Sequence, residues 1–164
     1  MRGSGSGPAG TPARTDLGQA GVPTTIPDRP GEPRLTNVRM LTNGGENAEA
    51  YWSADARRLI FQATRPGVSA CDQIFTMTAD GADVRMVSTG KGATTCAYFF
   101  PDGERILYSS THEHAAECPP RPDYSQGYVW PLHPFDIYTA RPDGSDLRRI
   151  GSSPHYDAEA TISP

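Results

Sequence analysis

The sequence predicts an all-β fold that is built from repeated four-stranded antiparallel units. Two observations lead to this prediction. Gly and Pro, 17 and 16 of the 164 residues, interrupt the chain too often for long helices, and one pattern recurs along it. The composition also excludes other classes. A total of 15 Lys and Arg against 19 Asp and Glu forms no basic arm for nucleic acid, and no apolar run approaches the ~20 residues of a membrane helix.

The repeat has two elements that keep a common register. Residues 50–61 (AYWSADARRLIF) match residues 97–108 (AYFFPDGERILY), and a third copy begins at residues 160–164 (ATISP). The second element, residues 72–84, matches residues 135–147. Successive copies lie 47 and then 63 residues apart, so the second unit carries 16 extra residues.

Each unit is predicted to contain four short strands, which in the first copy cover residues 48–53, 58–64, 73–78 and 84–88. Asp and Gly occupy the intervening turns, where they tolerate positive φ angles. A period near 40–45 residues with four strands per unit is typical of a β-propeller blade. Residues 37–42 are predicted to form an extra leading strand, which would complete the last blade of a closed ring.

The turn sequence Pro-Asp-Gly at residues 101–103, followed by Asp-Ile-Tyr at 136–138 and Asp-Gly at 143–144, resembles the PD40 (WD40-like, TolB-type) β-propeller repeat. The resemblance covers about residues 38–164. The first copy departs from it, since Ser-Ala-Asp-Ala stands at residues 53–56 where Ser-Pro-Asp-Gly is usual, as in a terminal repeat.

Composition and the resemblance together imply a particular organisation of the chain. Residues 1–36, with 7 Gly and 6 Pro among the first 35, are predicted to be a disordered tail, and residues 37–164 a partial propeller. The partial propeller would contain blade 1 (about 43–88), blade 2 (about 89–151) and the start of blade 3 (about 156–164). Propellers close with typically 4–8 blades, so we expect the N-terminal part of a longer, incomplete ring that needs further blades, from missing chain or from self-association.

The 16 extra residues lengthen the connection at residues 110–135, which is rich in aromatic residues and proline. Stiff aromatic loops often carry binding, and the alternative is a loop that folds over its own blade and buries Tyr128 and Trp130. The His-Glu-His sequence at 112–114, with Cys118 nearby, resembles a zinc site only weakly, and we predict no metal. The candidate binding surface comprises His112, His114, Tyr124, Tyr128, Trp130 and His133.

The three cysteines, Cys71, Cys96 and Cys118, are expected on one face of a propeller. In an exported protein a disulfide between Cys118 and either Cys71 or Cys96 is expected, whereas in a reducing compartment all three would be buried thiols. The sequence does not choose between these pairings.

Glu49 and Glu159 occupy the same repeat position, one residue before the Ala of the inner strand, and Cys96 takes that place in the second unit. The starts of inner strands line the mouth of the central channel. Carboxylates there would bind a cation or a basic peptide, and the alternative is a pair of solvated rim charges.

The sequence carries no catalytic motif, such as a Gly-x-Ser-x-Gly nucleophile elbow. We therefore predict a protein-binding or peptide-binding module with no cofactor, no nucleic-acid partner and no membrane insertion. The resemblance implies a TolB-like protein of the periplasm or exterior, although no signal peptide is visible and a cytoplasmic location is the alternative. The other function class is the gating or regulatory propeller of a longer hydrolase, of the prolyl oligopeptidase or amidohydrolase type.

Two blades leave sheet faces and inner edges unmatched in water. We therefore expect that residues 1–164 by themselves are not a stable monomer. A sharp, cooperative thermal transition, measured at low concentration on a sample of monomeric mass, would contradict this expectation.

Overall fold

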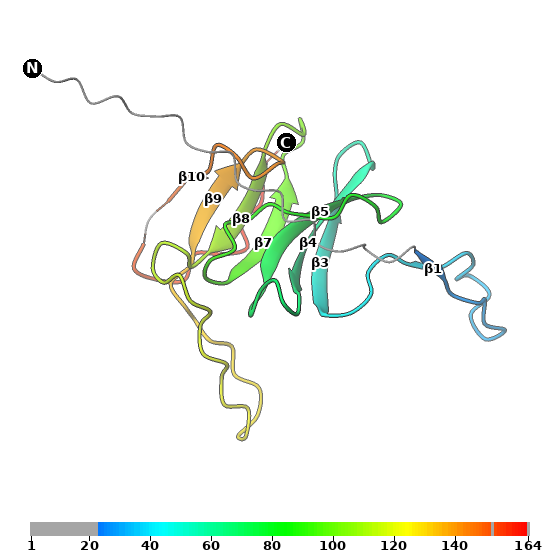
Figure 1. The fold of residues 1–164 in the computed structure, drawn as a ribbon, viewed down its shortest axis with the longest axis horizontal. Helices are drawn as coiled ribbons and strands as arrows, with labels where there is room; N and C mark the ends of the chain where they lie inside the picture. The colour runs from blue at the N-terminus through cyan, green and yellow to red at the C-terminus, as the bar shows by residue number, and fades with distance from the viewer. Residues whose placement is uncertain (1–22, 152, 164) are drawn as a thin grey trace, which may run out of the picture.

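The computed structural model describes residues 23–151 and 153–163, and these residues form β strands and no helix. Two four-stranded antiparallel sheets lie side by side and form the body of the molecule (Figure 1). The all-β prediction with four-stranded antiparallel units is therefore confirmed. The first sheet contains β3 (Glu46–Trp52), β4 (Arg58–Thr64), β5 (Gln73–Thr78) and β6 (Arg85–Met86), and the second contains β7 (Thr94–Phe99), β8 (Ile106–Ser110), β9 (Asp136–Ala140) and β10 (Arg148–Arg149).

The two sheets repeat each other in pairing register as well as in strand order. Ile60 of β4 pairs with Thr76 of β5, and Leu107 of β8 pairs with Thr139 of β9. Leu107 lies 47 residues after Ile60, and Thr139 lies 63 residues after Thr76. These are the two offsets of the sequence repeat. The sequence period is thus a structural period, with the extra residues confined to the connection between β8 and β9.

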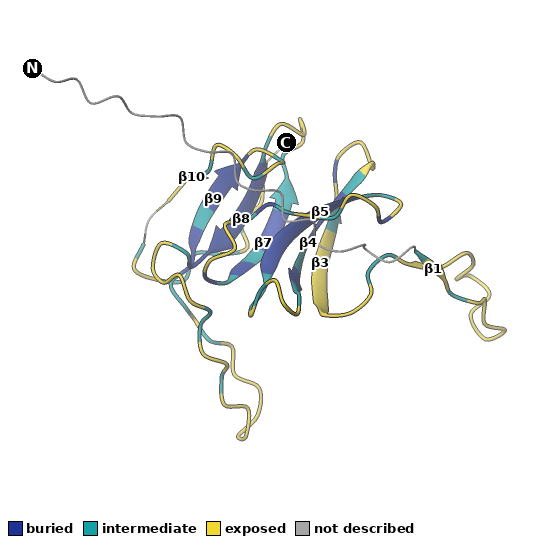
Figure 2. Cartoon of the chain, in the orientation of Figure 1, coloured by how far each residue is buried: buried dark blue, intermediate teal, exposed yellow. Residues whose placement is uncertain are grey.

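The main core lies between the two sheets. Alternate residues of β4 point to opposite faces, so Ile60 packs toward the second sheet while Leu59 and Phe61 pack on the far face. Burial on both faces explains why these strands lack an alternating polar pattern (Figure 2). The core between the sheets contains Ile60, Ile74, Val87, Ala97, Ile106, Tyr108, Tyr138 and Ala140, each at most 3% exposed.

The inner strands β3 and β7 carry the same irregularity. The pairing of β3 with β4 shifts register between Ala48 and Tyr51, and that of β7 with β8 shifts at the equivalent place. At this bulge Glu49 and Cys96 adopt left-handed backbone angles, with φ of 50° and 53°. Glu159, the third repeat equivalent, has φ of 59°, although residues 153–163 form no strand.

The N-terminal segment differs from its prediction. Only Arg39–Met40 (β2) of the predicted leading strand 37–42 is a strand, and it pairs with Thr24–Thr25 (β1) instead of with a blade. The hydrogen bond from Ile26 N to Val38 O (2.9 Å) extends this local ladder. The described part of the predicted tail 1–36 therefore contains a paired strand, and its residues 1–22 lie outside the described residues.

Truncation of the core between the sheets is expected to cost much more than truncation of an exposed aliphatic residue. Ile60→Ala removes a fully buried side chain and should lower the free energy of unfolding by about 2–5 kcal/mol. Ile150→Ala is the matched control, since Ile150 is 57% exposed and its loss should change stability by less than about 0.5 kcal/mol. Urea unfolding of both variants, at one protein concentration at which the wild-type chain is associated and folded, measures the two losses, and equal losses would contradict the placement of the core.

Candidate functional site

The long connection between β8 and β9, residues 111–135 and hereafter the arm, projects away from the two sheets (Figure 1). A disulfide joins its Cys118 to Cys71, which lies in the β4–β5 connection of the first sheet, with the two Cα atoms 5.7 Å apart. The sequence left two partners open for Cys118. In the structure the partner of Cys118 is Cys71, whereas Cys96 is a free, buried thiol. The arm of the second sheet is thus tied covalently to the first.

A close backbone approach at Gly92 holds the base of the arm. Gly92 N donates a hydrogen bond to Ala116 O (2.8 Å), and Gly92 O accepts one from the buried amide of Gln73 (2.7 Å). A Cβ atom at this position would lie 2.6 Å from Thr111 Oγ1 and 2.9 Å from Ala115 O, and φ is +59°. Only glycine fits this contact without displacing the arm.

A buried carboxylate at the start of β9 holds the first turn of the arm. Asp136, with a side chain 0% exposed, lies 2.9 Å from His114 Nε2 and 3.2 Å from Arg149 Nη1. Arg149 also pairs with Glu113 at 2.8 Å. A buried charge requires such partners. Asp136 is the repeat equivalent of Gln73, so both sheets place a buried polar anchor at this position.

His112 also belongs to the anchor. Its ring centroid lies 4.5 Å from that of Tyr138, and its Nδ1 lies 2.9 Å from Ser110 Oγ. Burial lowers the pKa of His112, which favours the neutral ring. Within residues 23–151 and 153–163 no group of three metal-ligating side chains converges. His112 and His114, predicted for a binding surface, therefore lie at the anchored base of the arm.

The far end of the arm, residues 124–132 and hereafter the tip, is largely exposed (Figure 2). It carries three aromatic rings that solvent reaches. Tyr124, Tyr128 and Trp130 are 49%, 73% and 52% exposed. The Tyr124 and Tyr128 rings stack in parallel, 5.5 Å apart with an interplanar angle of 2°, and Trp130 lies 6.2 Å from Tyr128 at 53°. The alternative that the loop buries these rings over its own blade is wrong. His133, on the returning side, is half-buried.

A local turn produces this stack. Gly127 N donates to Tyr124 O (3.0 Å), and Gly127 has φ of 111°, which glycine adopts readily. Asp123 accepts hydrogen bonds from the backbone N (2.8 Å) and hydroxyl (3.0 Å) of Ser125, which lower the pKa of Asp123. The turn thereby brings Tyr124 and Tyr128, four residues apart, to the same side.

The predicted channel-mouth residues gather around Cys96. Burial raises the pKa of the Cys96 thiol, the negative charge of Glu49 raises it further, and a hydrogen bond with the backbone of Glu159 opposes both. The rings of Tyr51 and Tyr98 lie 4.4 Å apart beside this group, and their hydrogen bond raises the pKa of Tyr98. This tyrosine pair was not predicted from the sequence, although its 47-residue spacing is that of the repeat.

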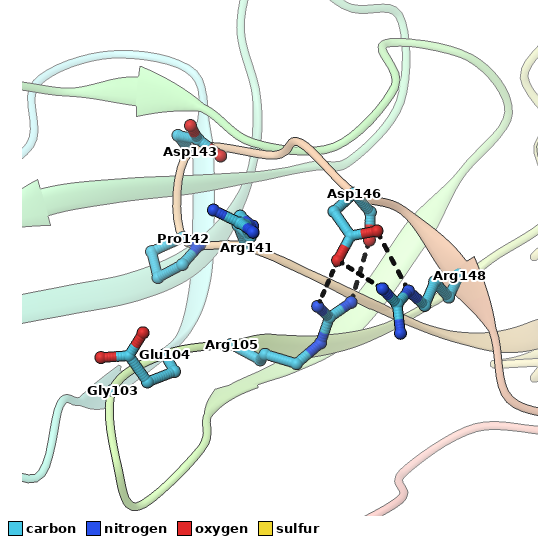
Figure 3. A pocket seen from close by; sticks show the side chains of 8 residues that line it. All are labelled: Gly103, Glu104, Arg105, Arg141, Pro142, Asp143, Asp146 and Arg148. Atoms are coloured by element: carbon cyan, nitrogen blue, oxygen red, sulfur yellow. Dashed lines mark hydrogen bonds and ion pairs between the residues drawn. The ribbon is translucent and has the colours of Figure 1, made fainter.

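A surface hollow lies between the β7–β8 turn and the β9–β10 turn of the second sheet, and charged side chains of these turns line it (Figure 3). Arg105 donates to the Asp146 carboxylate (2.8 Å), to Asp146 O (2.9 Å) and to Thr139 Oγ1 (2.8 Å), and Arg148 Nε donates to Asp146 Oδ1 (3.0 Å). These hydrogen bonds lower the pKa of Asp146. Because each nitrogen of the Arg105 guanidinium already donates a hydrogen bond within the sheet, we assign the hollow a structural role.

Comparisons with known proteins support the fold. No protein-family model matches the chain, and no curated protein matches it. The structure of a putative TolB from Agrobacterium tumefaciens matches with a TM-score of 0.51 and 20% identity, over 70% of this chain and 37% of that one. TolB from Acinetobacter baumannii matches with a TM-score of 0.46 and 17% identity, over 71% of this chain and 24% of that one.

The first of these similarities shows the fold. The chain has a β-propeller fold like that of the Agrobacterium protein, and its two sheets correspond to two blades. The chain spans about a third of the length of the Agrobacterium protein and less of the other. In the described part of the chain, no helix is long and apolar enough to cross a membrane.

Loss of the disulfide should loosen the arm and weaken the contact between blades. Cys118→Ser is expected to lower the free energy of unfolding by about 2–4 kcal/mol and to speed hydrogen exchange in residues 111–135. Cys71→Ser should have the same effect, and the double variant should add nothing. Exchange measured by mass spectrometry that leaves the arm as protected as in the wild type would contradict this role.

Proposed function

We propose that this chain is a non-catalytic, TolB-like propeller module that binds a protein partner through the tip of its arm. The observation that carries the proposal is the exposed stack of Tyr124, Tyr128 and Trp130. Tyr and Trp are the residue types most enriched among the anchors of protein interfaces, because they bury a large area at a small cost in side-chain entropy.

The anchored base makes the tip suitable for binding. The Cys71–Cys118 disulfide and the Asp136–His114 pair hold the arm at its start, and its five prolines restrict the remaining backbone. Binding costs less free energy when the loop is already ordered, so a stiff arm converts more of its contact area into affinity.

The channel mouth supplies a second surface in this proposal, and this one is acidic. Glu49 and Glu159 flank Cys96 at equivalent positions of the repeat, and carboxylates at a propeller mouth favour a cation or a basic segment of a partner. This role depends on further blades that complete the ring. The disulfide supports a periplasmic or secreted location, where such bonds persist.

Site-specific photocrosslinking tests the proposal. A photoreactive phenylalanine analogue at Tyr128 should yield one discrete protein adduct from the envelope fraction of the source organism, because Tyr128 is the most exposed ring of the tip. The same analogue at Ile150, which is 57% exposed and outside the arm, is the matched control and should yield none. Adduct formation that is equal at both positions, or unchanged by Trp130→Ala, would contradict the proposal.

A further inference from the structure

The tip of the arm has no charged side chain. The chain has a net charge of −4, yet no Asp, Glu, Lys or Arg occurs between Asp123 and Asp136. Val129 and Leu132, 50% and 71% exposed, add apolar area beside the three aromatic rings. A charged surface brought against the tip would lose hydration without gaining a counter-charge, so the tip favours an uncharged partner surface.

The shape of the arm determines which side of the contact is concave. The arm extends away from both sheets as a loop, with the tip at its far end (Figure 1). The surface hollow of the second sheet is lined by residues of the β7–β8 and β9–β10 turns, which do not belong to the arm. Side chains at the end of a projecting loop become buried only when a partner surrounds them. The tip is therefore suited to be the inserted element of a contact, with the cavity on the partner.

The polar atom of Trp130 is already satisfied within the chain. Trp130 shares a hydrogen bond with Tyr156, and because an indole N–H can only donate, the Tyr156 hydroxyl oxygen accepts it. Burial raises the pKa of Tyr156, and this hydrogen bond opposes the rise. Phe135 packs edge-on against the Tyr156 ring, with the centroids 5.7 Å apart. Apolar groups of a partner can therefore enclose the exposed part of the Trp130 ring without leaving a buried donor unpaired.

The two tyrosines of the tip set a further requirement on the partner. Their rings stack in parallel, 5.5 Å apart, and so enter a cavity as one block. Tyr128 is 73% exposed, and its hydroxyl donates a hydrogen bond to water or to a partner. A cavity that encloses the rings must therefore offer acceptors where the hydroxyls lie, and neutral acceptors such as backbone carbonyl oxygens agree with the uncharged tip.

A lipid bilayer is the other apolar environment that takes Tyr and Trp rings. Segments that lie in the membrane interface commonly carry Lys and Arg, which are attracted to anionic headgroups. The arm has one such residue, Arg121, against Glu113, Glu117 and Asp123. Charge thus favours a protein over an anionic membrane surface. We infer, on the basis of the function proposed above, that the tip inserts into an uncharged, apolar cavity of a partner protein.

The test places a charge of either sign at one position of the tip. The full chain with the photoreactive analogue at Tyr128 is titrated into the envelope fraction, and the chain concentration for half-maximal adduct is measured. Val129→Lys and Val129→Asp should each raise this concentration at least tenfold, because the cavity would bury either charge without a partner. Val38→Lys and Val38→Asp are the matched controls, since Val38 is 39% exposed outside the arm, and they should leave it unchanged.

Three results would overturn the inference. Stronger adduct formation with Val129→Lys would indicate an acidic partner surface, stronger formation with Val129→Asp would indicate a basic one, and no change with either variant would place Val129 outside the contact. In each of these cases the adduct persists, so the apolar cavity is wrong and the proposed function stands. If the chain with the analogue at Tyr128 forms no adduct at all, both fall. In a parallel measurement, flotation of the chain with phosphatidylcholine vesicles that Trp130→Ala abolishes would reassign the tip to a membrane surface.

Discussion

The packing of the two blades against each other is the constraint on which the rest of the structure depends. Ile60 and Ile74 of the first blade and Ile106 and Tyr138 of the second share one buried cluster, which fixes how the two sheets face each other. That arrangement brings the β4–β5 connection of one blade beside the arm of the next, so the disulfide and the Gly92 contact join elements that are distant in sequence. The site is therefore a product of the contact between blades.

The arm separates its functions along its length. Its base uses charge, with Glu113 and His114 of the arm held by Arg149 and by the buried carboxylate of Asp136. Its tip has no charged residue and exposes its rings. A base that resists motion and a tip whose rings stack on one another in solvent together form a surface that is ordered in advance of binding. The same repeat position that anchors the first blade through Gln73 serves here to fix the insertion.

The repeat made the sheets predictable because equivalent turns mark the ends of strands of similar length. The strands at residues 58–64 and 73–78 were predicted to the residue, since apolar and β-branched runs lie between Asp- and Gly-containing turns. The N-terminal strand was misassigned because its partner, Thr24–Thr25, lies in a Gly- and Pro-rich segment without hydrophobic periodicity. The anchoring roles of His112 and His114 were not predictable from spacing, because Asp136 lies 22 residues from His114 and meets it only through the fold.

Photochemically induced dynamic nuclear polarisation in NMR tests the central claim most directly, because it enhances signals only from Tyr and Trp rings that solvent can reach. In the free chain, we expect strong enhancement for Tyr124, Tyr128 and Trp130 and none for the buried rings of Tyr108 and Tyr138. Weak or absent enhancement of Tyr128 and Trp130 in the free chain would show that the arm covers its own rings, and the proposed binding tip would then be wrong.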